Sequence, residues 1–424
     1  MAERVDNKIV NFNAMFKAAT AHEDAISDAA RKRAEEFGSP WQVAAIMGRI
    51  GDALNAMEKA EQEDGGPTVL TSPGNELAAR MQATLAEHGT AFEPLPAGGE
   101  ELKFDSITDW YGWAWSWLSE WNDAHHKIVP PPSADPEPIK NDLRIALASD
   151  WGTGLYGAPV IAKDIATKCG EFDIVAHLGD VYYAGAAKEM QQRFLDAWPS
   201  CPGIINRALN GNHEMYSGGT PYFEQTLPKF GQKSSYFAWQ NDHWLIVALD
   251  TACLDFNLDD VQVKWFERLV SKSEDRRVLV LSHHQLFSQL DSQGPNLADK
   301  LGTLLHEKAI DVWYWGHEHR CVLYDKQEAS GLVARCIGHG GMPQRRGAEK
   351  EAPVDLEKCG VTWRKLPAKL GVPSAVILDG PNHFIKGDEK TYSPHGYVTL
   401  RFAGKALHES YVTPDGCVSR EGDL

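Results

Sequence analysis

Cysteine, basic residues and long apolar runs are scarce in this chain of 424 residues. The seven cysteines are scattered, odd in number and lack CxxC spacing, so we expect reduced thiols and neither a disulfide framework nor a structural zinc site. A formal net charge of −17 argues against unspecific binding to nucleic acid or to anionic membranes. The amino terminus lacks a signal-peptide core, and no stretch approaches the roughly 20 apolar residues of a membrane span. These absences predict a cytoplasmic protein.

The pattern of residues changes along the chain and predicts two domains. Residues 1–129 carry several segments with apolar residues at helical spacing, including the tryptophan stripe from Trp110 to Trp121, and predict an all-α amino-terminal domain. The proline-rich run 130–140 excludes a helix or a central strand and is read as a linker. In residues 141–424, strands alternate with helices, which is typical of a layered α/β domain.

The stretch from Leu143 to Tyr183 reads as a strand, a helix and a second strand, with an aspartate after each strand. In open α/β sheets the carboxyl ends of the strands meet at one crevice, so Asp150 and Asp180 are expected to face each other. Two carboxylates brought together need a cation. Taken alone, either aspartate is better explained as the cap of a following helix or turn.

Three further predicted strands end in polar residues of similar kind. Residues 203–209 precede Asn212 and His213, residues 277–281 precede His283 and His284, and residues 311–315 precede His317 and His319. Five successive strand ends of this type cannot be buried unpaired without a large cost, and a pair of divalent or trivalent cations satisfies them together. His317 and His319 lie about 6.6 Å apart along an extended chain, so each can serve a different metal of a pair separated by roughly 3.5–4 Å.

Taken in order, these motifs resemble those of the calcineurin-like metallophosphoesterases and, within them, of the purple acid phosphatases. The family order DxG, GDxxY, GNH(D/E), VxxH and GHxH occurs here as Asp150-Trp151-Gly152, Gly179-Asp180-Val181-Tyr182-Tyr183, Gly211-Asn212-His213-Glu214, Val280-Leu281-Ser282-His283 and Gly316-His317-Glu318-His319. The resemblance implies a four-layer α/β/β/α sandwich of two mixed sheets flanked by helices. The amino-terminal domain lies outside it.

The resemblance also implies a dinuclear metal centre. Its ligands would be Asp150, Tyr183 and His319 at the first metal, Asp180 as the bridge, and Asn212, His283 and His317 at the second metal. Gly152 stands where most of the superfamily has a histidine, and a tyrosinate from Tyr183 would favour Fe(III) at the first site, with Zn, Mn or Fe(II) at the second. The alternative for Tyr183 is an ordinary aromatic wall residue.

The implied function is hydrolysis of phosphoric esters, with a phosphomonoester as the expected small-molecule substrate. A metal-activated hydroxide would attack phosphorus in line with the leaving oxygen. His213 would protonate the leaving group or stabilise phosphoryl oxygens, Glu214 would orient His213, and His284 is a candidate for phosphate contact, with a packing role equally open. The loop 338–346, rich in glycine and arginine, either approaches the substrate or is a solvated turn.

Two alternatives to a phosphomonoesterase remain open from the sequence. One is a phosphodiesterase that acts on nucleotide-like or phospholipid-like esters, because the same metal core serves both reactions. The other is a non-catalytic metal-binding interaction protein whose acidic, tryptophan-rich amino-terminal domain is the functional part. The sequence does not indicate an oligomeric state.

Overall fold

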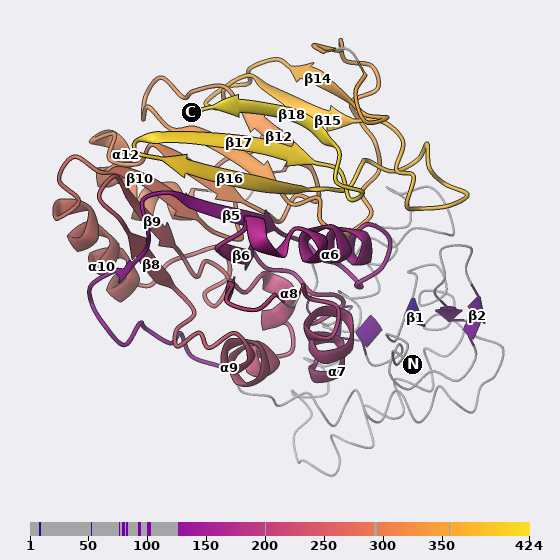
Figure 1. Ribbon diagram of the computed structural model, residues 1–424, viewed down its shortest axis with the longest axis horizontal. Helices are drawn as coiled ribbons and strands as arrows, with labels where there is room; N and C mark the ends of the chain where they lie inside the picture. The colour runs from indigo at the N-terminus through magenta and orange to yellow at the C-terminus, as the bar shows by residue number, and fades with distance from the viewer. Residues whose placement is uncertain are drawn as a thin grey trace.

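The computed structural model describes residues 126–424, except 200, 292–294 and 356, and short pieces of the preceding chain: 8–9, 52, 76, 79–80, 82–83, 92–94 and 100–102. Two sheets, which overlap in the view of Figure 1, dominate the described part of the chain. Strands of both sheets come from distant parts of the sequence, so the two sheets fold as one unit.

The six-stranded sheet has the order β18-β17-β16-β5-β6-β7. Its strands are β5 (Leu143–Ala148), β6 (Ile174–His177), β7 (Ile205–Ala208), β16 (Tyr397–Ala403), β17 (Ala406–Val412) and β18 (Val418–Asp423). β5, β6 and β7 are parallel, and α6 (Ala158–Thr167) connects the first two. The strand, helix, strand unit predicted around Asp150 and Asp180 is therefore confirmed.

The nine-stranded sheet has the order β14-β15-β12-β13-β11-β10-β9-β8-β4. Its strands are β4 (Glu137–Pro138), β8 (Phe237–Gln240), β9 (Trp244–Ala248), β10 (Arg277–Leu281), β11 (Val312–Trp315), β12 (Cys321–Tyr324), β13 (Val333–Ile337), β14 (Thr362–Leu366) and β15 (Ala375–Asp379). β9, β10, β11 and β13 are parallel neighbours, whereas β8 and β9 form an antiparallel hairpin. Mixed pairing in both sheets agrees with the expected fold class.

Short helical segments connect these strands. They are α7 (Ala187–Glu189), α8 (Asn212–Met215), α9 (Leu227–Lys229), α10 (Asp260–Ser271), α11 (Asn296–Lys300) and α12 (Gly302–His306), with a 3-10 turn at Cys169–Glu171 and π-helical turns at Met190–Leu195 and Tyr222–Thr226. The longest, α10, begins where the Asp259 side chain accepts a hydrogen bond from the N–H of Gln262 (2.8 Å). None of the described helices is both long enough and apolar enough to cross a membrane.

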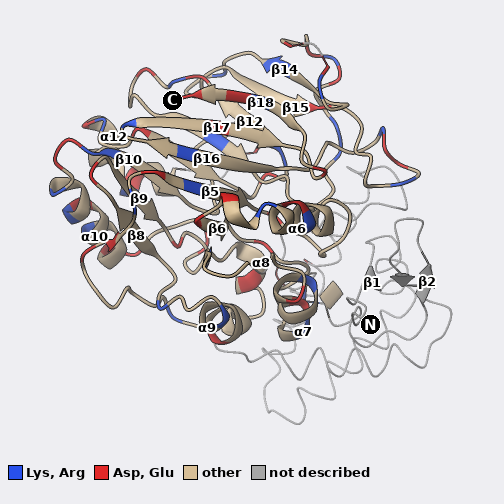
Figure 2. Ribbon diagram, in the orientation of Figure 1, with Lys and Arg blue, Asp and Glu red and all other residues tan. Residues whose placement is uncertain are grey.

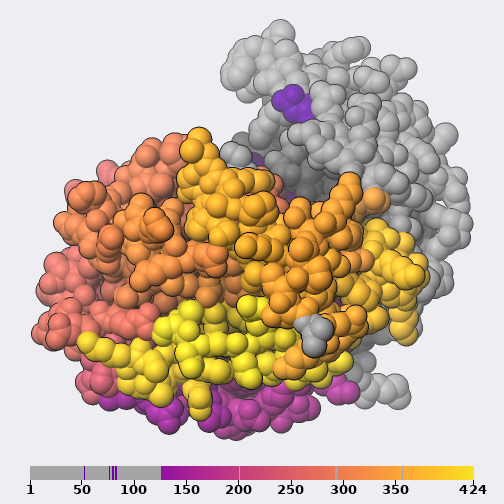
Figure 3. Space-filling model, turned by 90° about the horizontal axis from the view of Figure 1, so that it is seen from above, coloured from indigo at the N-terminus to yellow at the C-terminus, as the bar shows by residue number. Residues whose placement is uncertain are grey.

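Apolar side chains fill three layers and define the sandwich. Leu147 of the six-stranded sheet and Ile246 of the nine-stranded sheet belong to the core between the sheets. Phe266 on α10 packs on the outer face of the nine-stranded sheet, and Ile161 on α6 packs on the outer face of the six-stranded sheet. The α/β/β/α layering is therefore confirmed. In Figure 3 the yellow carboxyl-terminal strands lie at the surface of the molecule.

A buried ion pair connects the two sheets. Arg335 on β13 donates to both carboxylate oxygens of Glu409 on β17 at 2.9–3.1 Å. The hydroxyls of Tyr314 and Tyr411 donate to the same carboxylate at 2.6 and 2.7 Å. Because every partner is buried and hydrogen-bonded, this network fixes how the sheets stack.

The region before residue 130 departs from the all-α prediction. Strands β1 (Lys8–Ile9), β2 (Phe92–Pro94) and β3 (Glu100–Leu102) form a three-stranded sheet of order β1-β3-β2. β2 and β3 are an antiparallel pair, and β1 runs parallel to β3. Residues 52, 76, 79–80 and 82–83 are helical, whereas the rest of the predicted helical segments and the tryptophan stripe lie outside the described residues.

Two disulfide bonds correct the prediction of reduced cysteines. Cys169 pairs with Cys201 and Cys359 pairs with Cys417, over separations of 32 and 58 residues, whereas Cys253, Cys321 and Cys336 are free. Spacing alone could not reveal pairs that only the fold brings together. Because disulfides persist in oxidising compartments, these bonds weigh against the predicted cytoplasmic location.

The charges of the described elements are mixed. Figure 2 shows Lys and Arg interspersed with Asp and Glu over the helices and strands. That nucleic acid is not a partner stays a prediction.

Candidate metal centre

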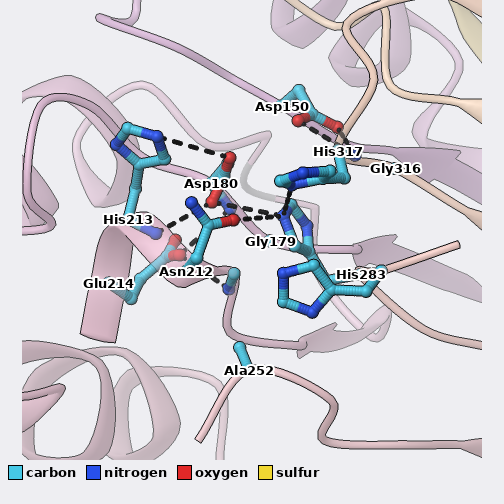
Figure 4. Close-up of polar contacts among 12 residues, drawn as sticks. Asp150, Gly179, Asp180, Asn212, His213, Glu214, Ala252, His283, Gly316 and His317 are labelled. Atoms are coloured by element: carbon cyan, nitrogen blue, oxygen red, sulfur yellow. Dashed lines mark hydrogen bonds and ion pairs between the residues drawn. The ribbon is translucent and has the colours of Figure 1, made fainter. Parts of the chain in front are cut away.

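The predicted polar residues lie just beyond the carboxyl ends of parallel strands in both sheets. Asp150 follows β5, Asp180 follows β6, Asn212 begins the short helix after β7, His283 follows β10, and His317 follows β11. Figure 4 shows their side chains converging from these separate segments. The two sheets therefore share one site along their carboxyl edges, as expected from the strand topology.

Several of these residues have strained backbones. Asp150, Asp180, His317 and His319 have φ values of 56°, 75°, 69° and 50°, in the left-handed region that side chains other than glycine rarely adopt. Each such conformation costs on the order of 1–3 kcal/mol and persists only where the surrounding structure imposes it. Strain gathered at one set of strand ends is a sign of a functional site.

Two motif glycines are required because the polar side chains come so close. A Cβ atom at Gly211 would collide with the Asp180 carboxylate, and one at Gly316 would collide with Ser149 and the Asp150 carboxylate. Neither glycine has a positive φ, so space rather than backbone conformation makes it necessary.

The first group of candidate ligands consists of Asp150, Asp180 and His319, whose ligand atoms all lie within 4.8 Å of one another. His319 Nε2 lies 3.6 Å from Asp150 Oδ1. The Asp150 carboxylate also accepts hydrogen bonds from Ser149 Oγ (2.6 Å) and from the N–H of His317 (2.9 and 3.1 Å). These bonds orient the carboxylate and still leave it close to Asp180.

The second group consists of His283, His284 and His317, again within 4.8 Å of one another. His283 Nδ1 lies 2.9 Å from the carbonyl of Leu178, so it carries the proton and leaves Nε2 to face the site. That Nε2 is 3.2 Å from Asn212 Oδ1 and 3.3 Å from Asp180 Oδ1. Asp180 thus lies between the two groups, where a bridging ligand belongs.

The electrostatics of the site call for positive charge. Asp150 and Asp180 are both 0% exposed. Burial, opposed by His283 and reinforced by Asp180, raises the pKa of Asp150 well above its usual value. Burial also raises the pKa of Asp180, but His283 and His213 outweigh it and hold that pKa well below its usual value. The residues therefore fit a pair of cations, which would compensate the buried carboxylates and engage the neighbouring imidazoles.

A tyrosine hydroxyl does reach the first group, but it belongs to Tyr182. Its hydroxyl lies 2.6 Å from His319 Nε2 and 3.0 Å from Asp180 Oδ2. The ring of Tyr183, the predicted ligand, has the guanidinium of Arg193 at 5.4 Å from its centroid. The structure thus offers Tyr182 as the phenol beside the site, and the assignment to Tyr183 stays a prediction. The spacing of GDxxY was the one sequence feature that favoured Tyr183 over its neighbour.

His213 lies at the edge of the site. Its Nδ1 is 2.5 Å from the carbonyl of Tyr183, its Nε2 is 4.0 Å from Asp180 Oδ2, and its ring stacks on Tyr182 with centroids 3.8 Å apart. Burial lowers the pKa of His213 in spite of Asp180. With Nδ1 held by a carbonyl, Nε2 is the nitrogen that faces the Asp180 carboxylate.

Glu214 has a different role from the predicted one. Its carboxylate accepts hydrogen bonds from the N–H groups of Gly211 (2.7 Å), Asp180 (3.0 Å) and Val181 (2.9 Å), so it does not orient the His213 ring. It fastens the loop after β6 to the loop after β7, and each loop carries a predicted ligand. Burial and the Asp180 charge raise the pKa of Glu214 to about 7. Glu214 is a positioning residue.

The loop 338–346 contributes packing rather than free positive charge. A Cβ at Gly338 or Gly340 would meet Asp150 or Ser149, so these glycines allow the loop to lie against the end of β5. The Arg346 guanidinium is held by the Asp379 carboxylate at 2.7 and 2.9 Å. The loop is therefore not a solvated turn at Gly338 and Gly340, which pack against the end of β5. The Arg346 guanidinium is already paired with Asp379.

These features define an α/β sandwich with a metal-binding site at its strand ends. A model of the calcineurin-like phosphoesterase family matches residues 143–321, a range that contains every predicted ligand. The chain therefore contains a calcineurin-like phosphoesterase domain. No curated protein is similar enough in sequence to match it.

Several solved structures resemble this chain at a distance. Purple acid phosphatase PPD1 from yellow lupin (Lupinus luteus) seeds is 17% identical with a TM-score of 0.48, and the match spans 70% of this chain and 55% of the lupin chain. GAP50, described as the anchor in the inner membrane complex of Plasmodium, is 15% identical over 67% of this chain and 89% of its own, with a TM-score of 0.47. PhoD is 12% identical over 70% of this chain and 69% of its own, with a TM-score of 0.43. Likeness at this level carries no argument about activity.

Proposed function

We propose that the chain is a dinuclear-metal phosphoric ester hydrolase that acts on phosphomonoesters. The observation that carries the proposal is the arrangement of two ligand groups on either side of the buried Asp180 carboxylate. Asp150, His319 and a tyrosine would hold one cation, Asn212, His283 and His317 the other, and Asp180 both. The monoester preference rests on the motif resemblance.

Bound cations supply two kinds of chemistry, because they lower the pKa of a coordinated water and neutralise charge on phosphoryl oxygens. The chain supplies the orientation. The Nδ1–H of His283 is fixed on Leu178, and the Asp150 carboxylate is fixed by Ser149 and by the His317 N–H. Both of these candidate ligands are thus preorganised by a partner behind them.

His213 is the candidate proton donor to the leaving oxygen. Its Nδ1–H is committed to the Tyr183 carbonyl, so any proton delivered to substrate leaves from Nε2. Nε2 faces the Asp180 carboxylate at 4.0 Å, which stabilises the protonated ring. A positioned general acid of this kind contributes about 10²–10⁴ in rate.

The test compares metal-loaded protein on p-nitrophenyl phosphate and on bis(p-nitrophenyl) phosphate. We expect faster hydrolysis of the monoester, and loss of both activities in Asp180→Asn, because that change removes the shared carboxylate. Faster hydrolysis of the diester would replace the proposal with a phosphodiesterase. Loaded wild-type protein that cleaves neither ester would indicate a non-catalytic metal-binding protein.

A further inference from the structure

His284 is held in one tautomer by the loop after β9. Its Nδ1 lies 3.1 Å from the carbonyl oxygen of Thr251 and 3.0 Å from the Thr251 hydroxyl. Because a carbonyl can only accept, Nδ1 carries the ring proton and Nε2 presents a lone pair. Within the described part of the chain, Nε2 is buried and has no hydrogen-bond partner. An acceptor left in this state costs free energy unless something binds it.

The ring of His284 faces two predicted ligands of the second metal. Its centroid lies 4.7 Å from that of His283 and 4.9 Å from that of His317. Each of the three imidazoles offers a nitrogen within 4.8 Å of the other two. With Nδ1 occupied by Thr251, Nε2 is the nitrogen of His284 that is left to bind a metal.

The backbone and the neighbours of His284 keep the ring in this place. Its N–H donates to the Thr251 hydroxyl (3.1 Å), and its carbonyl accepts from the hydroxyl of Ser282 (2.7 Å). The ring of Phe256 lies over it with centroids 3.9 Å apart. A histidine whose far nitrogen donates to a backbone carbonyl, and whose ring is clamped, has the arrangement of an oriented metal ligand.

We propose that His284 is a direct ligand of the second metal, so that this site holds three imidazoles in addition to the Asn212 amide and the shared Asp180 carboxylate. The inference deepens the proposed function and rests on its metal centre. Of the histidines, the motif resemblance assigns only His283 and His317 to this metal. Three imidazoles make the site rich in nitrogen, which suits Zn²⁺ and related borderline ions better than Mg²⁺ or Ca²⁺.

The first test titrates metal-free full-length protein with Zn²⁺ and compares His284→Ala with His395→Ala. His395 is a matched control because it is also buried and also has a ring nitrogen without a hydrogen-bond partner among the described residues. We expect His284→Ala to lose more than about 100-fold in affinity for one equivalent, beyond the about 10–100-fold cost of removing an outer partner. His395→Ala should keep wild-type affinity. A loss within that smaller range would overturn direct ligation.

The second test needs no variant and so does not depend on folding. X-ray absorption of the wild-type protein loaded with two equivalents of Zn²⁺ counts its imidazole ligands. We expect four, one from His319 and one each from His283, His284 and His317, whereas three would overturn the inference. Wild-type protein that binds fewer than two equivalents would overturn the metal centre itself, so the two failures are distinguishable.

Discussion

Replacing Glu214 with glutamine should weaken metal binding more than it weakens the fold. In the structure Oε2 accepts the N–H groups of Gly211 and Asp180, and Oε1 accepts the N–H of Val181. A glutamine oxygen can keep the first two bonds, but its NH₂ group would then face the third donor. One buried N–H without a partner costs about 1–3 kcal/mol. Glu214 sets the distance between the loop that carries Asp180 and the loop that carries Asn212. Losing one of its hydrogen bonds should therefore displace both of these predicted metal ligands.

We therefore expect Glu214→Gln to reduce Zn²⁺ affinity by about 10–100-fold, the range seen when an outer-shell partner of a metal ligand is lost. The assay combines competitive metal titration with denaturant unfolding of the metal-free protein. Glu409→Gln is the control. Glu409 lies in the middle of β17 and forms the buried ion pair with Arg335. The substitution weakens this pair, and breaking a buried pair costs about 3–5 kcal/mol of stability. This control should lose stability and keep metal affinity. If Glu214→Gln behaves in the same way, the loop-clamp explanation is wrong.

Three further predictions concern the acid, the tyrosine and the pH dependence. His213→Ala should retain its metals by elemental analysis and lose turnover most strongly on esters with poor leaving groups; equal losses on all esters would exclude proton donation. If Fe(III) occupies the first site, a visible charge-transfer band should vanish in Tyr182→Phe and persist in Tyr183→Phe, and the opposite result would restore the motif-based assignment. Burial raises the pKa of Glu318 from 4.5 to about 7, so between these values Glu318 keeps a proton in the folded metal-free protein that it loses in the unfolded chain. Glu318 should therefore contribute a fall in stability of about 3 kcal/mol as the pH rises through that window, and Glu318→Gln should lack this share of the fall; a pH profile identical to that of the wild type would refute the assignment.

The sequence was sufficient to predict the strand ends of the site. Buried strands such as Leu143–Ala148 and Arg277–Leu281 are short apolar runs that stop at a polar residue, and parallel topology brings their carboxyl ends to one edge. The expected ligand positions Asp150, Asp180 and His283 followed from this rule. The apolar period of a strand is a local property of the sequence, and the parallel connection of consecutive strands is nearly local. Both can therefore be predicted without knowledge of how distant loops meet.

Details that depend on how distant loops meet could not be read from the sequence. His284 meets Thr251 across 33 residues, and no motif links these positions. The choice between Tyr182 and Tyr183 depends on the path of the backbone after β6, where the Glu189 carboxylate binds the N–H of Tyr183 (2.5 Å). The two disulfides join cysteines whose spacing carries no signature.

The central claim is that hydrolysis depends on two metal ions held at the strand ends. The most direct measurement is the activity of metal-free protein on p-nitrophenyl phosphate as a metal ion is added in known equivalents, with elemental analysis at each point. The account predicts no hydrolysis without metal and a rise that ends at two equivalents. Full activity in protein shown to contain no metal, or a maximum at one equivalent, would contradict it.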